Sequence, residues 1–279
     1  MSNRMIRVFP RRTKWTPTDD MAFVGEPPLM ATTYPRTMPV RVSVTFTWDR
    51  EEGERLQRSW RRFFRDVQVG GPACGDPGGE FTPGMFVKEG VVVTSRGCPK
   101  RCNFCLVPQR EGPIRELRIK VGWNIFDNNL LACSRDHVEE VFVMLWHQKE
   151  PANFTGGLDK TLLMPWVIDL LKSTRIKRMW FALDSESGFW SLERAADLLS
   201  DFSREKKYCY VLVGYENETP EEAEVRLIRV FSLGFMPFSM LYRGPLAGAK
   251  MSSDPAWRAL IRKWCNPARY KAFMRDRDV

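Results

Sequence analysis

The chain has 279 residues, which is enough for one large domain or for one domain and a half. Hydrophobic residues make up 43% of it, and ten tryptophans and eighteen phenylalanines are present, so we expect a substantial core and exclude a disordered chain. The net charge of +9 permits an anionic partner such as nucleic acid, but charge spread over solvated helix faces is equally typical of a basic soluble enzyme.

The seven cysteines are odd in number and mostly scattered, which is not the pattern of a disulfide framework. This use of cysteine is typical of a reducing compartment. The first five residues lack the apolar core of a signal peptide, and no apolar run approaches the length of a transmembrane helix. We therefore expect a cytoplasmic protein with no membrane partner.

The first ninety residues divide by composition into two parts. Residues 1–39 contain six prolines and several basic residues, which predicts an irregular arm laid over the surface without a core of its own. Residues 40–90 predict a small Rossmann-like unit that ends in a linker rich in glycine and proline at 70–90.

The small unit is predicted from a strand–helix–strand pattern. Residues 40–48 alternate apolar and polar side chains, as a strand does. Asp49 and Glu52 then have the spacing of a capping box at the start of a helix. The run from Val67 to Pro72 predicts a second strand that ends in a turn.

Three of the cysteines, Cys98, Cys102 and Cys105, fall within eight residues and have the spacing C-x3-C-x2-C. The apolar run from Val91 to Thr94 predicts a buried strand before them, so we expect them on a loop at the carboxyl end of a strand, where active sites collect in α/β proteins. A metal or cluster would hold such thiols deprotonated. Ordinary 4Fe–4S clusters take four cysteines, so three would leave one iron open to another ligand.

Two other interpretations of these cysteines are open. A structural zinc site takes four ligands, usually as two close pairs. The two histidines, His137 and His147, form no such pair with the cysteine run, although Cys133 with His137 could complete a site. The spacing also fits one face of a helix with buried cysteines, which Pro99 alone does not exclude but which the preceding strand disfavours.

From residue 91 onward, predicted strands and helices alternate, which indicates an α/β fold with a parallel sheet and right-handed crossovers. Thr219, Pro220 and Glu222 mark one helix start with a cap, a first-turn proline and a capping-box partner. Asp254 starts a last helix, which we expect to cover the open side of the sheet. The six predicted strands are residues 91–94, 122–127, 153–155, 179–183, 208–213 and 236–242.

The cysteine spacing, with Phe104 in the aromatic position, resembles the signature of the radical S-adenosylmethionine (radical SAM) superfamily, whose usual form is C-x3-C-x-aromatic-C. The resemblance implies a partial (β/α)6 barrel over residues 91–245, followed by a C-terminal helical extension at 246–279. It implies that the three cysteines are the catalytic cluster ligands, and that the open iron of a 4Fe–4S cluster chelates the amino and carboxylate groups of SAM. Reductive cleavage would then yield a 5′-deoxyadenosyl radical that abstracts hydrogen from a substrate.

The resemblance also implies where SAM is held and what delivers the electron. Phe104 would pack near the adenine. The electron donor would be a protein such as flavodoxin or ferredoxin. The substrate and the reaction outcome are not implied, and nucleic acid is one candidate substrate class because of the charge.

Polar residues at the predicted strand ends are the remaining candidates for SAM binding. Asp127 or Asn128 stands where the family has a Gly-Gly-Glu-like turn and would accept the methionyl amine. Asp184 and Ser185 stand where relatives often have a Glu-Ser pair. Gly214 would allow the backbone to approach the adenine or ribose closely. Each carboxylate could equally serve as a helix cap or a turn residue.

Some radical SAM enzymes carry a cobalamin-binding Rossmann domain before the cluster loop, and the run from Val69 to Ala73 is similar to the end of such a domain. No histidine precedes residue 90, and the unit is too short for the full fold, so we predict a reduced relative without cobalamin. At the other end of the predicted barrel, Tyr242 and Arg243 are expected to face its mouth and meet substrate.

Two functions of other classes remain open at this point. A zinc-stabilised nucleic-acid-binding protein would use the same cysteines together with the basic surface. An iron–sulfur electron-transfer protein would bind a cluster but no SAM. The bound metal separates the zinc protein from the other two, and SAM cleavage separates those two from each other.

Overall fold

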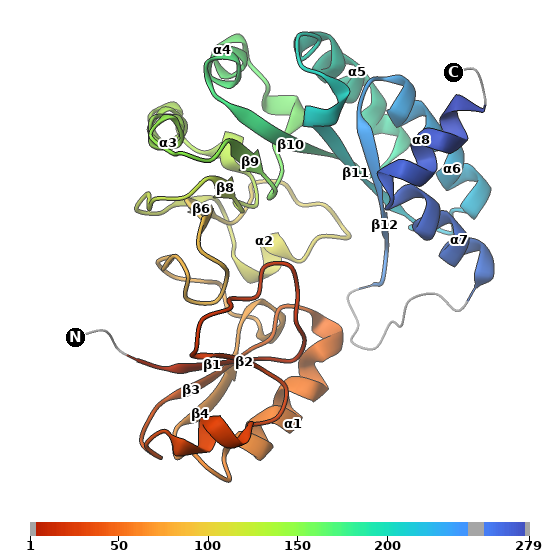
Figure 1. Ribbon diagram of the computed structural model, residues 1–279. Coiled ribbons are helices and arrows are strands. Elements are labelled where there is room, and N and C mark those ends of the chain that lie inside the picture. Colours follow the sequence, from red (N-terminus) through yellow and green to blue (C-terminus); the bar gives the residue numbers. More distant parts are fainter. Residues whose placement is uncertain (1–3, 245–253, 277–279) are drawn as a thin grey trace. The chain divides into compact units, whose positions relative to one another are not determined.

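The computed structural model describes residues 4–244 and 254–276. It is a mixed α/β protein with parallel sheets, which confirms the predicted class (Figure 1). Within the described residues, a first compact unit holds residues 4–91 and 97–113, and a second holds residues 92–96, 114–244 and 254–276. The barrel predicted over residues 91–245 therefore includes a stretch that the structure groups with the first unit.

A four-stranded parallel sheet with the order β2-β1-β3-β4 forms the first unit. Its strands are β1 (Ile6–Phe9), β2 (Ala22–Val24), β3 (Val40–Ser43) and β4 (Val67–Gly70). The prediction of an irregular arm over residues 1–39 was wrong, because β1 and β2 lie there. The run from Ile6 to Phe9 is completely buried beside β3, so tertiary pairing orders a strand too short to stand out among the prolines.

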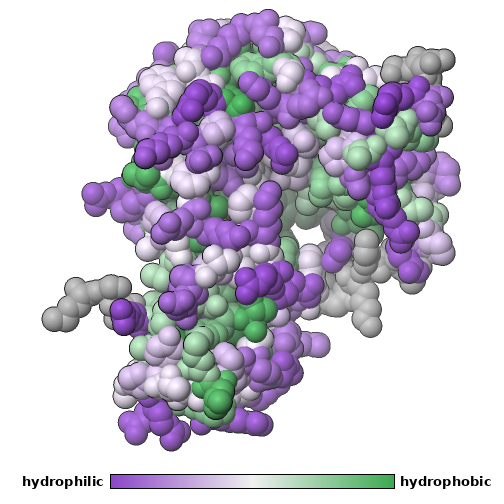
Figure 2. Space-filling view, in the orientation of Figure 1, coloured by the Kyte–Doolittle hydropathy of each residue, from purple (hydrophilic) through white to green (hydrophobic). Residues whose placement is uncertain are grey.

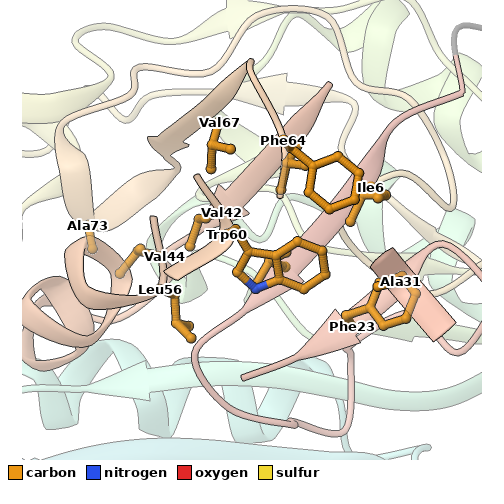
Figure 3. Packing of buried hydrophobic residues seen from close by; sticks show 12 residues of the cluster. Ile6, Phe23, Ala31, Val42, Val44, Leu56, Trp60, Phe64, Val67 and Ala73 are labelled. Carbon is orange, nitrogen blue, oxygen red and sulfur yellow. The ribbon is translucent and has the colours of Figure 1, made fainter. Parts of the chain in front are cut away.

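Helix α1 (Arg50–Trp60) packs Leu56 and Trp60 into the core of the first unit. Trp60, fully buried, lies among the sheet side chains in Figure 3, where Phe23 and Phe64 pack beside its ring. Its indole Nε1 donates to the Gly25 carbonyl at 3.0 Å. Two short 3₁₀ helices, η1 (Leu29–Thr33) and η3 (Pro72–Cys74), lie in the connections.

The start of α1 differs from its prediction. A 3₁₀ turn, η2 (Thr47–Asp49), precedes the helix, and the Asp49 side chain makes no capping hydrogen bond. The Asp49 carboxylate instead pairs with the Arg11 guanidinium, which lies 38 residues earlier in the chain. The predicted capping box was therefore wrong, because a long-range charged partner outcompetes the local backbone N–H.

The second unit is built on a six-stranded sheet with the order β12-β11-β10-β9-β8-β5, which is the order of the chain. The strands are β5 (Val91–Val92), β8 (Asn124–Ile125), β9 (Ala152–Phe154), β10 (Ile176–Leu183), β11 (Lys207–Val213) and β12 (Met236–Leu241). All pairings from β8 to β12 are parallel. The six strands lie where they were predicted, with β5 and β8 shorter than expected.

Helices separate these strands and lie along one side of the sheet (Figure 1). They are α3 (Arg135–Trp146), α4 (Pro165–Ser173), α5 (Phe189–Leu198) and α6 (Pro220–Ser232). The capping box predicted for α6 is confirmed: Thr219 accepts from the Glu222 N–H, and the Glu222 carboxylate accepts from the Thr219 N–H. Hydrophilic side chains cover much of the visible surface (Figure 2).

The predicted last helix is α7 (Pro255–Trp264), and it begins at Asp254 as expected, because the Asp254 side chain accepts from the Ala256 N–H. It packs on α6 and on β12, the edge strand of the sheet. A further helix, α8 (Pro267–Arg275), was not predicted; Tyr270 of this helix stacks on Trp264. The remaining parts of the expected extension, 246–253 and 277–279, lie outside the described residues. No helix in the described ranges combines the length and apolarity needed to cross a membrane.

Candidate functional site

The cysteine loop, residues 97–113, belongs to the first unit. Cys98, Cys102 and Cys105 lie in non-helical backbone ahead of a single helical turn, α2 (Val107–Arg110), so they are not one face of a helix. Cys105 N–H donates to the Cys102 carbonyl at 3.0 Å, which makes a tight turn between two of the cysteines. The three side chains are half-buried and form no disulfide. Solvent and ligands can therefore reach them.

Two backbone contacts close this loop on itself. The Gly97 N–H donates to the Glu111 carboxylate at 3.2 Å, and the Cys98 N–H donates to the Gly112 carbonyl at 3.2 Å. Gly97 has φ +82°, and a Cβ there would overlap the Pro113 carbonyl, so glycine is required. Glu111 is only 6% exposed and also pairs with Arg110. Glu111 was not predicted from the sequence. The Gly112-Pro113 pair that follows it was the available signal that the loop turns there.

A short antiparallel pair, β6 (Ser95–Arg96) with β7 (Arg115–Glu116), flanks the loop in sequence. This pair belongs to the second unit, so the chain enters and leaves the loop through adjacent strands. Residues 97–113 thus leave and rejoin the chain between two paired strands.

Asp127 holds the segment that leads into the cysteine loop. Its carboxylate accepts from the Thr94 N–H at 2.7 Å, from the Thr94 hydroxyl at 2.6 Å and from the Ser95 hydroxyl at 2.7 Å. Asp127 is 1% exposed, and burial raises its pKa although the hydrogen bonds from Thr94 and Ser95 act in the opposite direction. The prediction that Asp127 meets the methionyl amine stays a prediction, and the geometry gives this residue a structural task.

A second layer of polar groups lies behind Asp127. His137, buried on α3, has Nε2 3.3 Å from the Thr94 hydroxyl and Nδ1 3.9 Å from the Glu116 carboxylate. Burial raises the pKa of Cys133 to about 12, so it remains a thiol at neutral pH, although a hydrogen bond with Ser95 acts in the other direction.

The metal-ligating side chains of the described chain bear on the zinc and iron–sulfur sites that the sequence suggests. Across residues 4–244 and 254–276, no three side chains of His, Cys, Asp or Glu are gathered to hold a metal ion. The described chain therefore holds no closed four-ligand site of the zinc or ferredoxin kind, and the loop thiols are not themselves drawn to one point. By chemistry, three thiols on one short loop fit a 4Fe–4S cluster that keeps one iron open.

The carboxyl ends of β8, β9 and β10 carry several of the predicted residues. Asn128 and Asp184 are half-buried, and Ser185 is exposed, with its hydroxyl 2.9 Å from the Ser187 hydroxyl. Lys160, which sequence reasoning missed, donates to the Ala182 carbonyl at 2.5 Å, two residues before Asp184. This places a cation at the end of β10, where an anionic ligand group would be favoured.

The glycine pair after β9 has a packing role. The Gly156 N–H donates to the Ile125 carbonyl at 2.9 Å, and a Cβ on Gly156 would overlap the Asp127 carbonyl. Glycine therefore lets the ends of β8 and β9 approach closely.

The loop after β11 has unusual backbone geometry. Gly214, Glu216 and Asn217 all have left-handed φ values, of +74°, +54° and +62°. The Glu218 carboxylate accepts from the Gly214 N–H at 2.8 Å and pairs with the buried Arg226. Non-glycine residues in this region store strain and occur often at binding sites. Glu218 thus fixes the loop, in addition to preceding helix α6.

Aromatic rings surround this loop. Tyr215 packs edge-on against Tyr242 with ring centroids 4.8 Å apart. A Cβ on Gly214 would stand 3.4 Å from the Trp257 ring and 3.0 Å from Leu241, so this glycine lets the α7 aromatic side chain approach the end of β11. Tyr242 and Arg243, both half-buried, follow β12 at the same edge of the sheet.

Two comparisons with known proteins were negative: no protein-family model matches the chain, and no curated protein is significantly similar to it.

Proposed function

We propose that this chain is a radical SAM enzyme, in which Cys98, Cys102 and Cys105 hold a 4Fe–4S cluster. The observation that carries the proposal is the cysteine loop: three reachable thiols on non-helical backbone, in a loop whose ends are closed by Glu111 and Gly112. The ends of the loop are tied through the Gly97 and Cys98 N–H groups, so a bound cluster would have to draw only the three cysteine side chains together.

When bound, the cluster and SAM would supply the electron transfer and the 5′-deoxyadenosyl radical that abstracts hydrogen from a substrate. The protein's own task is to bind and orient. Phe104, Asn128, Asp184, Ser185 and Gly214 are the proposed SAM contacts. Lys160 joins them, because its ammonium group suits the methionyl carboxylate.

Asp127 has a positioning role in this proposal. It fixes Thr94 and Ser95 through three hydrogen bonds, and these residues directly precede Arg96 and Gly97. The chain therefore enters the cysteine loop from a rigid segment.

The six-stranded sheet supports the partial barrel that this function implies. Its strands follow one another in chain order, and helices α3, α4, α5 and α6 connect the last five of them. The first crossover differs, because only the single turn of α2 lies between β5 and β8 beside the β6–β7 pair. An electron donor such as flavodoxin or ferredoxin is the proposed partner, and the cytoplasm is the proposed location.

Anaerobic reconstitution of the full chain with iron and sulfide, followed by dithionite and SAM, tests the proposal. We expect a brown protein with about four irons per chain, and 5′-deoxyadenosine detected by mass spectrometry. Cys102→Ala should lose the cluster and the product. Cys74→Ala, which changes an exposed cysteine of the first unit, should keep both.

Three outcomes contradict the proposal. A colourless protein with tightly bound zinc favours the zinc-stabilised nucleic-acid-binding protein. A full cluster with no bound SAM favours the electron carrier. If Cys102→Ala keeps as much iron as the wild type and Cys74→Ala, the cluster is held by other residues.

A further inference from the structure

The two faces of the six-stranded sheet are buried to different extents. On the helix-covered face, the side chains of Met179, Phe181 and Leu183 on β10 are fully buried. On the opposite face, which we call the inner face, Trp180 is buried against Tyr208 and Tyr210, whereas Ala182, Tyr210 and Phe238 are only half-buried. Parallel sheets are normally covered on both faces, so a partly exposed inner face rich in aromatic and amide groups indicates a binding surface.

Three aromatic side chains from adjacent strands form a platform on the inner face. Trp180 and Tyr210 are stacked, with ring centroids 4.2 Å apart and planes 18° apart. Phe238 meets both rings edge-on, at 5.8 Å from Trp180 and 6.0 Å from Tyr210. Tyr210 lies opposite Ala182 in the strand register, and the small side chain there leaves space beside the tyrosine ring. A planar ligand ring can add to such a stack.

Amide side chains lie on the neighbouring strands of the same face. Asn153 Nδ2 donates to the Asn124 carbonyl oxygen at 3.0 Å and to the Thr155 hydroxyl at 2.8 Å. The Thr155 hydroxyl donates to the same Asn124 oxygen at 2.7 Å, which fixes all three groups. Asn153 Oδ1 is buried and accepts no hydrogen bond from any described residue. A buried acceptor of this kind is costly unless a ligand supplies the donor.

A hydrogen bond joins the platform to the amides. The Tyr210 hydroxyl donates to the Thr155 carbonyl at 3.2 Å. Burial raises the pKa of Tyr210 to about 12, so the hydroxyl keeps its proton and remains a donor. Stacking rings and an unpartnered acceptor are therefore held in one fixed arrangement.

We propose that the inner face binds a nucleobase, stacked on the half-buried Tyr210 ring beside Trp180 and donating an N–H to Asn153. A planar ring with an N–H at its edge satisfies both features, and the positive net charge suits the phosphate attached to a nucleotide. Trp180 and Tyr210 each lie four residues before the strand ends at Asp184 and Gly214, so this surface is separate from the proposed SAM contacts. The role of the base as a substrate rests on the proposed function. Its binding to the inner face does not depend on that function.

The test is binding of GMP, CMP and UMP to the full chain, followed by saturation-transfer NMR and titration. These probes contain no adenine, so they do not report the SAM site. We expect saturation transfer to the base protons of at least one nucleotide. Asn153→Leu, which removes the acceptor, and Tyr210→Leu, which removes the ring, should each weaken that binding at least tenfold. Trp190→Ala, at an aromatic residue that is 73% exposed on α5, should leave it unchanged.

The outcomes separate this inference from the proposed function. Tyr210→Leu leaves the side-chain hydrogen bonds among Asn124, Asn153 and Thr155 in place, so weaker binding in both variants is not explained by loss of that network, and circular dichroism checks each variant. Absence of binding to the wild type, or equal binding by Asn153→Leu, overturns the inference even if 5′-deoxyadenosine forms. Binding by a protein that takes no cluster would keep the inference and overturn the enzyme.

Discussion

The backbone N–H of Gly97 donates to the buried carboxylate of Glu111 at 3.2 Å, and this contact joins the two ends of the cysteine loop. The residues are 14 apart in sequence, so neither predicts the other locally. The shape of the loop therefore depends on Glu111, which is not one of the three cysteines. Its removal should change metal binding without removing a ligand.

Replacing Glu111 with alanine should loosen the cysteine loop. A hydrogen bond to a charged group contributes about 1.5–3 kcal/mol, so we expect iron bound after reconstitution to fall several-fold. Iron and sulfide content per chain measures this, with the visible absorption as a second readout. Glu80→Ala, at an exposed position of the first unit, is the control. Full iron content in Glu111→Ala would show that the loop does not need this contact.

Gly97 and Gly112 offer a matched pair of substitutions. Both have left-handed φ values, +82° and +75°, but a Cβ on Gly97 overlaps the Pro113 carbonyl, whereas one on Gly112 meets nothing within 4 Å. Gly112→Ala should cost about 1–2 kcal/mol for the left-handed backbone alone. Gly97→Ala should cost more and should also lower iron content. Urea unfolding of both variants measures the difference, and equal losses would contradict the predicted overlap.

Asp127 should lower the stability of the folded protein as the pH rises. Burial raises its pKa, so its contribution to stability is fully present below the ordinary pKa of aspartate and is lost as the pH rises from there through the raised pKa of the folded state. Asp127→Asn does not titrate and should gain stability relative to the wild type between about pH 4 and pH 7. Urea unfolding at both pH values measures this gain.

Asp66 provides the opposite case as a control. A hydrogen bond from Arg41 lowers the pKa of the exposed Asp66 carboxyl, so its contribution is present above the ordinary pKa and is lost as the pH falls. Asp66→Asn should therefore lose stability relative to the wild type as the pH rises from about 2 to 4, the range below the ordinary pKa of aspartate. If the stability of both variants relative to the wild type changed with the same sign as the pH rises, the opposite pKa directions of Asp127 and Asp66 would be contradicted.

The cysteines should differ in reactivity. Burial raises the pKa of Cys133 and of Cys209 to about 12, and Cys209 is fully buried, so thiolate is scarce at pH 8 for both. Alkylation by iodoacetamide before reconstitution should label the exposed Cys74 at least tenfold faster than either. Peptide mass spectrometry gives the rates. Fast labelling of Cys133 in the folded protein would contradict its burial.

Local patterns predicted much of the second unit. The helix start at Thr219 was correct because the cap, the proline and the capping-box glutamate lie within four residues and act through the backbone of the same turn. The strands of the six-stranded sheet were predicted for a similar reason, since long apolar runs such as β10 and β11 have few alternatives once helices separate them.

Local patterns failed where a distant partner decided the outcome. Asp49 has the spacing of a cap, yet Arg11 takes its carboxylate. The strand from Ile6 to Phe9 is short and lies among prolines, and it becomes recognisable only when Val40 and its neighbours pair with it.

The sequence by itself determined the α/β class, the succession of strands and helices from residue 91, and the placement of three cysteines within one short run. These features depend on spacing and periodicity, which act over a few residues. Only the tertiary structure decided that β1 and β2 belong to a sheet, that Glu111 closes the cysteine loop, and that the inner face carries aromatic rings beside an unpartnered Asn153 oxygen. Those features depend on contacts between distant residues, whose energies arise when folding buries the partners together.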